Sequence, residues 1–206
     1  MIPNGLIEPN KIYIIGDRQV GKTNLVNRLT NKEFEVHTIS PLGIESNVLA
    51  LVSPYKTTTY YTLKDVTDDK VKCKYIKKFL KDIENAKMVI VLFSIFDLKS
   101  FEYAEKLIEY ILSSISNNFM PILLVGNKND LLKKDKKKRI PPERIIAAFK
   151  KMPEYIKYFE ISLKEDNNVS LIKEEIERIE LDQDNYEEEE AKTSKLNNEA
   201  SSCIIF

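Results

Sequence analysis

The hydrophobic positions of this chain fall into short apolar runs that alternate, in the later half, with amphipathic segments. The runs, which are typical of β-strands, cover residues 11–15, 47–52, 57–63, 87–95, 121–125 and 156–161. Helical spacing of apolar residues covers 101–115, 145–149 behind Pro141 and Pro142, and 169–180. This alternation predicts a doubly wound α/β domain with a mostly parallel six-stranded sheet.

Two of the runs, 47–52 and 57–63, are separated by only a few residues around Pro54. Such a short connection predicts a hairpin, and therefore one antiparallel edge strand in the sheet. Beyond residue 181 the chain is rich in Glu, Asn, Ser and Lys, and this composition cannot offset the entropy of ordering. We therefore expect one folded domain over 1–180 and a disordered acidic tail over 181–206.

Composition and charge refine this division of the chain. The 206 residues are 43% hydrophobic and 31% charged, which suits one domain with a buried core. From residue 181 onward seven acidic residues and two lysines give a net charge of −5, so residues 1–180 carry +5. The longest apolar stretch, 88–96, has about half the length that spans a bilayer, and no secretory leader is recognisable. Together with only two cysteines, this favours a reducing, cytosolic setting over a secreted or transmembrane one.

A glycine-rich loop follows the first predicted strand. Residues 16–23 read Gly-Asp-Arg-Gln-Val-Gly-Lys-Thr, which matches the phosphate-binding pattern GxxxxGK[ST] between a strand and a helix. In such a loop the backbone N–H groups and the helix N-terminus surround the α- and β-phosphates. Lys22 would reach the β- and γ-phosphates, and the Thr23 hydroxyl would bind Mg²⁺. The candidate phosphate-binding residues are Gly16, Asp17, Arg18, Gln19, Val20, Gly21, Lys22, Thr23 and Asn24.

A second motif, Asn127-Lys128-Asn129-Asp130, follows the fifth predicted strand. An Asp there can accept hydrogen bonds from the N1–H and 2-amino groups of guanine, which adenine lacks. The tetrapeptide is weak by itself in a chain this rich in Asn and Lys. Its position strengthens the interpretation as a guanine-binding motif, because open α/β sheets bind ligands at the carboxyl ends of their strands.

Together with the strand order, the two motifs resemble the Ras-superfamily small GTPases, most closely the Rab branch, over roughly residues 10–180. The resemblance implies a P-loop NTPase fold of the small-GTPase type that binds GTP and GDP with Mg²⁺ and hydrolyses GTP. It also implies that Asn127 and Asp130 read guanine and that Lys128 packs along its ring. The resemblance also implies that Ser162, Leu163 and Lys164 form the family's third base motif. Phe34 falls where relatives have an aromatic residue that covers the nucleotide; the alternative is that Phe34 packs at the edge of the core.

The first switch departs from the family. Relatives place a Thr there, whose hydroxyl binds Mg²⁺ and senses the γ-phosphate. Without gaps Pro41 falls at that position, and proline has neither the hydroxyl nor the N–H. Thr38 and Ser40 are the two candidates to replace the missing ligand after a shift of the loop.

The second switch departs further. Of the family's Asp-x-x-Gly-Gln, Asp65 remains and can hold Mg²⁺ through water, whereas Asp68 and Asp69 replace the Gly and the Gln. Asp69 cannot present an amide N–H₂ to orient the attacking water. In the phosphate loop, Arg18 and Gln19 stand where relatives have small residues, and Arg18 is a candidate arginine finger in cis. We expect guanine nucleotide binding with very slow GTP hydrolysis or none.

The last four residues, Cys203 to Phe206, match a C-a-a-X prenylation motif whose Phe favours geranylgeranyl. Because one lipid needs a second signal for stable anchoring and the tail is acidic, we expect reversible association with the cytosolic face of membranes. The resemblance implies a role in vesicle traffic or signalling. Its expected partners are effectors, an exchange factor, a GAP and a prenyl-binding chaperone.

Between Lys133 and Arg139 the chain carries a run of basic residues. No aromatic residue interleaves with it, so we expect a solvated loop that could touch anionic headgroups rather than nucleic acid. Two alternatives to a GTP-driven switch stay open. One is a pseudo-GTPase interaction module that holds nucleotide without switching or holds none; the other, a P-loop ATPase or kinase, is disfavoured by the NKxD motif.

Overall fold

The computed structural model describes residues 10–38, 43–52, 58–66, 76–115 and 120–179. The chain divides into two compact units, Met1–Leu171 and Ile172–Phe206. The tail, the Pro54 turn, Ser40, Pro41, Asp68, Asp69 and both cysteines lie outside the described residues. The division of the chain at residue 180 stays a prediction.

The first unit is built on a six-stranded sheet with the order β2-β3-β1-β4-β5-β6. Its strands are β1 (Lys11–Gly16), β2 (Ile44–Val52), β3 (Thr58–Val66), β4 (Met88–Ser94), β5 (Ile122–Asn127) and β6 (Lys157–Glu160). All neighbouring strands are parallel except β2 and β3. The predicted α/β fold, with one antiparallel strand at its edge, is confirmed.

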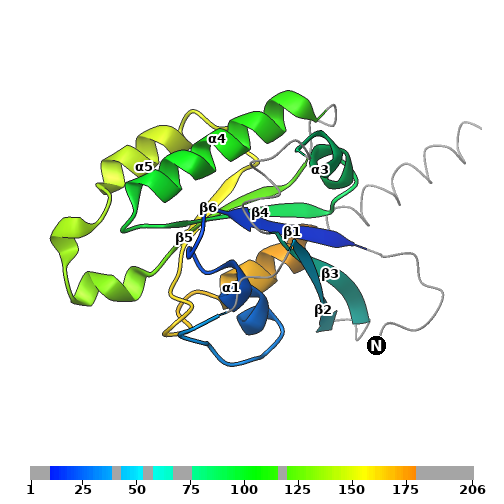
Figure 1. Cartoon of the computed structure of the whole chain (residues 1–206), viewed down its shortest axis with the longest axis horizontal. Helices are drawn as coiled ribbons and strands as arrows, with labels where there is room; N and C mark the ends of the chain where they lie inside the picture. The colour runs from blue at the N-terminus through cyan, green and yellow to red at the C-terminus, as the bar shows by residue number, and fades with distance from the viewer. Residues whose placement is uncertain (1–9, 39–42, 53–57, 67–75, 116–119, 180–206) are drawn as a thin grey trace, which may run out of the picture. The chain divides into compact units, whose positions relative to one another are not determined.

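Helices cover both faces of this sheet. The helix α1 (Lys22–Leu29) lies on one face, and α3 (Ile76–Ile83), α4 (Leu98–Ser114) and α5 (Pro142–Phe149) lie on the other (Figure 1). Two short 3-10 helices, η1 (Asn129–Lys133) and η2 (Lys136–Lys138), connect β5 to α5. No helix within the described residues is long and apolar enough to cross a bilayer.

Continuous apolar strands place the core at the centre of the sheet. Every residue of β4 and β5 is buried, as expected for parallel strands covered on both faces. Aromatic pairs join the helices to the strands: the rings of Tyr13 and Phe79 meet edge to face at 5.8 Å, and those of Phe93 and Phe101 lie 4.8 Å apart. This packing fixes the carboxyl ends of β1, β4 and β5, where the candidate site lies.

Several elements depart from the sequence-based prediction, among them β3, which runs to Val66 instead of ending at residue 63. The strand β2 begins at Ile44 instead of residue 47, because its pairing with β3 continues to Ile44 opposite Val66 although the added residues are exposed. The helix α3 was not predicted. The strand β6 contains only four residues.

The described part of the second unit, residues 172–179, is helical, within the predicted segment 169–180. Inside this helix, Arg178 forms an ion pair with Glu175 at 2.8 Å, three residues earlier.

Candidate nucleotide-binding site

The glycine-rich loop connects β1 to α1 and is shaped by two glycines. A Cβ on Gly16 would lie 2.2 Å from the Leu92 carbonyl oxygen of the neighbouring strand, so only glycine fits there. Gly21 precedes the helix with φ of 109°, a conformation that other residues rarely adopt. Gln19 has φ of 58°, and both Arg18 and Gln19 are exposed. The loop is therefore held in the sharp turn that a phosphate cradle requires.

Lys22, the first residue of α1, folds back over this loop. Its ammonium group donates hydrogen bonds to the carbonyl oxygens of Gly16 at 3.0 Å and Asp17 at 2.8 Å. The lysine charge therefore lies at the mouth of the turn, beside the backbone N–H groups that a phosphate would approach. The role of Lys22 in binding the β- and γ-phosphates stays a prediction.

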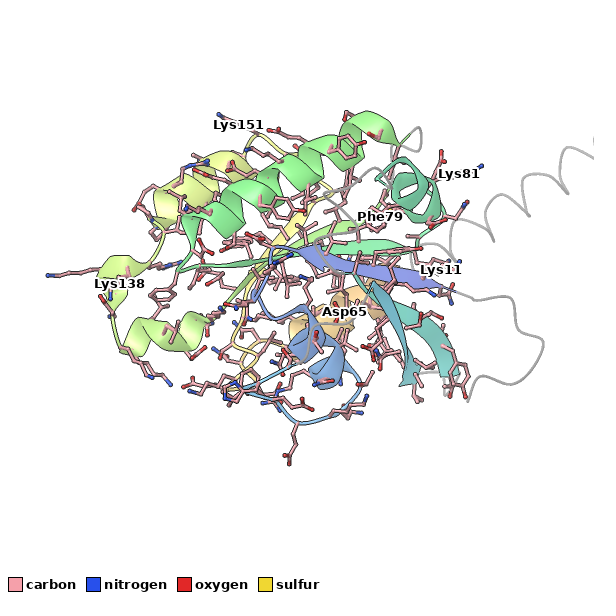
Figure 2. All side chains as sticks on the ribbon, viewed as in Figure 1. Lys11, Asp65, Phe79, Lys81, Lys138 and Lys151 are labelled. Atoms are coloured by element: carbon pink, nitrogen blue, oxygen red, sulfur yellow. The ribbon has the colours of Figure 1, made fainter. Side chains whose placement is uncertain are left out.

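Thr23, in α1, and Asp65, which Figure 2 labels on the α1 side of the sheet, form the adjacent part of the site. The Thr23 hydroxyl donates to Asp65 Oδ2 at 2.7 Å. Asp65 is 1% exposed, and its other oxygen, Oδ1, is buried without a hydrogen-bond partner among the described residues. Burial raises the pKa of Asp65 and Glu45 adds to this, whereas the Thr23 hydrogen bond and the Lys22 charge oppose it.

An unpartnered carboxylate oxygen beside a hydroxyl oxygen fits a hard cation such as Mg²⁺, which prefers oxygen ligands. Within the described residues, no three His, Cys, Asp or Glu side chains gather as a metal cluster. A divalent cation at Thr23 and Asp65 would therefore need further oxygens from a phosphate and water, as Mg²⁺ sites at phosphates usually do.

Asn24 connects α1 to the segment that follows it. Its side-chain amide donates to the Glu35 carbonyl oxygen at 2.8 Å, and its carbonyl oxygen accepts from the Glu35 N–H at 2.9 Å. Phe34, the preceding residue, is half-buried, and so is Thr38. The two bonds fix the backbone next to Phe34.

Asn127, at the end of β5, joins the phosphate loop to the base loop, residues 162–165. Its side-chain N–H₂ donates to the Val20 carbonyl oxygen at 2.8 Å, and its oxygen accepts from the Leu163 N–H at 3.2 Å. The side chain is 4% exposed. A Cβ on Gly21 would lie 2.5 Å from the same amide nitrogen, which gives that glycine a second reason to lack a side chain.

Asp130 and Ser162 are brought together although they belong to different motifs. The buried Ser162 hydroxyl donates to Asp130 Oδ1 at 2.8 Å and accepts from the Glu165 N–H at 3.0 Å. Lys128 has φ of 75°, and burial lowers its pKa while Asp97 and Asp130 act in the opposite direction. Asn127, Lys128, Asp130, Ser162 and Leu163 thus lie together at the carboxyl ends of β5 and β6, whereas Phe34 belongs to the segment after α1.

Arg28, near the end of α1, is a site residue that sequence reasoning missed. Its guanidinium donates to the Leu163 carbonyl oxygen at 2.9 Å and to that of Lys164 at 3.2 Å, and it lies 3.9 Å from the Asp166 carboxylate. The base loop is therefore held by α1 as well as by Asn127. No sequence pattern marks this role, since an Arg in the last turn of a helix is ordinary.

Comparisons with known proteins identify the family to which this chain belongs. The model of the Ras family matches residues 11–181, and the chain belongs to this family. The Ras-related protein RabC of Dictyostelium discoideum is 28% identical over 163 residues, which cover 79% of each chain. The Ras-related protein Rab-11B of the same organism is 27% identical over 159 residues, covering 77% of this chain and 68% of its own.

A third relative is the Ypt/Rab-type GTPase ypt7 of Pyricularia oryzae. It is 26% identical over 182 residues, which cover 86% of this chain and 85% of the relative. The family match and these Rab-named relatives together define a small GTPase of the Ras superfamily, in its Rab branch.

Proposed function

We propose that this chain is a Rab-type small GTPase that binds GTP and GDP with Mg²⁺, hydrolyses GTP slowly, and regulates vesicle traffic or signalling at membranes. One observation supports the nucleotide site most strongly: the Asn127 side chain bonds to the phosphate loop and the base loop at once. Two motifs that lie far apart in the sequence are therefore joined by one side chain, which supports a single ligand with a phosphate end and a base end.

In this proposal the phosphate loop, residues 16–21, and the start of α1 hold the phosphates. The N–H groups of the loop surround them, and Lys22 exchanges its bonds to the Gly16 and Asp17 carbonyl oxygens for phosphate oxygens. This exchange should strengthen phosphate binding, because hydrogen bonds between a lysine ammonium group and a phosphate are charge-assisted. Arg18 is exposed at the loop, and it stays the candidate arginine finger for an outer phosphate.

At the other end, Asp130 reads guanine while Ser162 holds one of its carboxylate oxygens. The bond from Ser162 to Oδ1 leaves Oδ2 and the remaining lone pairs to accept from N1–H and the 2-amino group. Lys128 packs along the ring, and Phe34 closes the pocket from the side of α1. Adenine offers no such donors, and Asp130 would be left unpaired beside it, so guanine is favoured.

Thr23 and Asp65 would hold Mg²⁺, Asp65 through water. When bound, this ion would neutralise charge on the β- and γ-phosphate oxygens. The residues supply an oxygen with no hydrogen-bond partner in the described part of the chain, at Asp65 Oδ1. Their contribution is to place two oxygen ligands beside the Lys22 end of the phosphate loop.

Slow hydrolysis follows from the residues at the γ-phosphate end. Catalysis of phosphoryl transfer rests on positioning and electrostatics, and the water-orienting Gln of relatives is Asp69 here. Asp68 adds negative charge where relatives have a Gly, and Pro41 cannot supply the switch Thr hydroxyl. These three substitutions all act on sensing or cleaving the γ-phosphate and leave guanine recognition untouched.

Membrane association would come from geranylgeranyl attachment at Cys203 in the motif Cys203-Ile204-Ile205-Phe206. Family membership supports effector and regulator partners in general. Within the proposal these partners are effectors, an exchange factor, a GAP and a prenyl-binding chaperone. One lipid beside an acidic tail favours reversible binding, with the protein otherwise in the cytoplasm. Replacement of Cys203 by Ser would abolish this membrane fraction; equal membrane fractions of the two chains would contradict the proposal.

The test is a nucleotide titration followed by single-turnover hydrolysis. Purified chain should bind GDP and GTP exchangeably, lose affinity when EDTA removes Mg²⁺, and discriminate against ATP. With GTP bound it should form GDP far more slowly than an ordinary relative does. An intrinsic rate at or above that of such a relative contradicts slow hydrolysis. Absence of exchangeable nucleotide would favour the pseudo-GTPase module, which the comparisons do not support.

A further inference from the structure

Within the described residues, the surface outside the candidate nucleotide site carries a concentrated charged feature, the basic loop, residues 133–139. Its six basic residues are interrupted only by Asp135, and they are Lys133, Lys134, Lys136, Lys137, Lys138 and Arg139. The loop contains the end of η1 and all of η2, between β5 and α5. Figure 2 marks Lys138 on this loop, on a different part of the surface from Lys81 of α3 and from Lys151.

The backbone of the basic loop is fixed by hydrogen bonds. The Lys134 N–H donates to the Leu131 carbonyl oxygen at 2.9 Å, and the Asp135 carboxylate caps η2 by accepting from the Lys137 N–H at 3.1 Å. After the loop, the Ile140 N–H donates to the Ile95 carbonyl oxygen at 2.8 Å, and the Ile140 side chain is buried. The positive charges therefore project from an ordered platform, so docking them loses little backbone entropy.

Ion pairs anchor the two ends of this loop. Lys133 lies 2.8 Å from the Glu165 carboxylate, in the base loop. Arg139 pairs with Glu160 at the end of β6, and Glu160 also accepts from the Tyr158 hydroxyl at 2.7 Å. These pairs tie the ends of the basic loop to the strand and loop behind the base site, and they neutralise the terminal charges only.

The middle of the loop is different. Lys134, Lys136 and Lys137 are exposed, and among the described residues none of their ammonium groups has a side-chain hydrogen bond or an ion pair. Lys138 pairs only with Asp135, at 3.2 Å, and its side chain stays 79% exposed. Like charges packed this closely repel one another, and a surface of anions relieves that repulsion.

The chemistry of the loop selects the kind of anion. Residues 128–140 contain no Phe, Tyr or Trp, so there is no platform on which a nucleic-acid base could stack. Protein interfaces are depleted in Lys at their centres and need apolar anchors, which the middle of the loop lacks. Lysines are compact charges without fixed geometry, and they suit a diffuse array of lipid phosphates and carboxylates.

We propose that the basic loop is a docking surface for anionic phospholipid bilayers, and that it supplies the second membrane contact which a single lipid chain requires. The bilayer contact involves Lys134, Lys136, Lys137 and Lys138, while Arg139 and Lys133 hold the loop in place. The contact itself does not depend on the proposed lipid at Cys203 or on bound nucleotide. Its importance in the cell rests on that proposed lipid, which brings the protein to the membrane.

The test is vesicle sedimentation of the full chain without lipid, at low ionic strength. Vesicles of phosphatidylcholine are compared with vesicles in which about one third is phosphatidylserine. The variant Lys134→Gln/Lys136→Gln/Lys137→Gln is set against a matched control, Lys81→Gln/Lys150→Gln/Lys151→Gln, whose three lysines are also exposed. Each basic residue near an anionic surface contributes a factor of about five, so the loop variant should lose about 100-fold in affinity.

The control variant should stay within about twofold of the unmodified chain, and about 0.5 M salt should remove the difference between loop variant and control. Equal phosphatidylserine binding by the loop variant and the unmodified chain overturns the proposal, and so does an equal loss in the control. Dependence of RNA binding, but not vesicle binding, on the three lysines overturns it in favour of nucleic acid. GDP binding, measured on the same samples, checks folding and reports separately on the proposed nucleotide site.

Discussion

The two ends of the candidate nucleotide site are built in different ways. At the base and inner-phosphate end, bonds between distant segments hold the site, such as Asn127 to Val20 and Leu163, and Ser162 to Asp130. At the γ-phosphate end, the family's chemistry rests on a few side chains of two loops, and three of these positions are substituted. The difference teaches that, in the proposed site, recognition of a nucleotide and response to its last phosphate would have separate physical supports, so that one could be lost without the other.

The largest expected effect comes from breaking the base end at Asp130. In Asp130→Ala the hydrogen-bond acceptors for N1–H and the 2-amino group are gone, and GDP affinity should fall by about 1000-fold or more while the weak affinity for ADP barely changes. Titration with both nucleotides measures this discrimination. Asp82→Ala, at an exposed position of α3, is the control. Unchanged preference for GDP in Asp130→Ala would remove the proposed base reader.

Repair of the γ-phosphate end is expected to have the next largest effect. In Asp68→Gly/Asp69→Gln the acidic pair is replaced by the residues that relatives use, so an amide can orient the attacking water. Single-turnover hydrolysis should accelerate by about 100-fold, within the range of one positioned catalytic group. Asp68→Gly alone, which lacks the amide, serves as the control. A rate that does not respond would show that Asp69 is not what limits hydrolysis.

Loss of the Asn127 side chain should destabilise the base and inner-phosphate end of the candidate site. In Asn127→Ala the Val20 carbonyl and the Leu163 N–H lose a buried partner, and the free energy of unfolding should fall by about 2–3 kcal/mol. Urea unfolding measures this, and GDP should also dissociate faster. Asn129→Ala is the matched control, because the backbone N–H of Asn129, not its side chain, bonds to Ile161. Equal stabilities of the two variants would contradict the linking role of Asn127.

The smallest effect is a pH dependence at Asp65 in chain free of metal and nucleotide. Burial raises the pKa of this carboxyl, so the folded state favours its protonated form. That contribution to stability is complete below the pKa of an unfolded Asp, and it is lost as the pH rises through the raised value. At neutral pH Asp65→Asn should therefore stabilise the metal-free chain by about 1–2 kcal/mol.

Thermal unfolding across this pH range measures the Asp65 effect, and Asp82→Asn, at an exposed position, should change nothing. Added Mg²⁺ with GDP should stabilise the unmodified chain but not Asp65→Asn to the same extent. A destabilised Asp65→Asn chain without metal would mean that the buried charge is compensated in a way the structure does not display.

The fold and the two main motifs could be predicted because their signals are local. The strands β4 and β5 are continuous apolar runs. The two glycines of the phosphate loop stand out because the whole chain contains only five. The helix α3 also carried a local signal, since Ile76, Phe79 and Ile83 recur at helical spacing, and it was overlooked.

Other parts of the site had no local signal. Arg28 reaches the Leu163 and Lys164 carbonyl oxygens across 135 and 136 positions of the chain, and Asn24 pairs with the backbone of Glu35. Such bonds depend on how folded elements meet, which periodicity does not encode. The base motif at Ser162-Leu163-Lys164 also lacks a clear local signal. Its contact with the other base motif, the bond from Ser162 to Asp130, forms only because β5 and β6 are neighbours in the sheet.

The link formed by Asn127 has a consequence for how the proposed protein could switch between a GDP-bound and a GTP-bound state. The bonds from Asn127 join the phosphate loop to the base loop in the chain without a ligand, and neither bond would involve the γ-phosphate of a bound nucleotide. In the proposed nucleotide complex these bonds would hold GDP and GTP alike. A difference between the two proposed bound states would then have to arise in the two switch segments, around residues 38–45 and 65–69, and a partner that contacts only Asn127 and the base loop would not detect it.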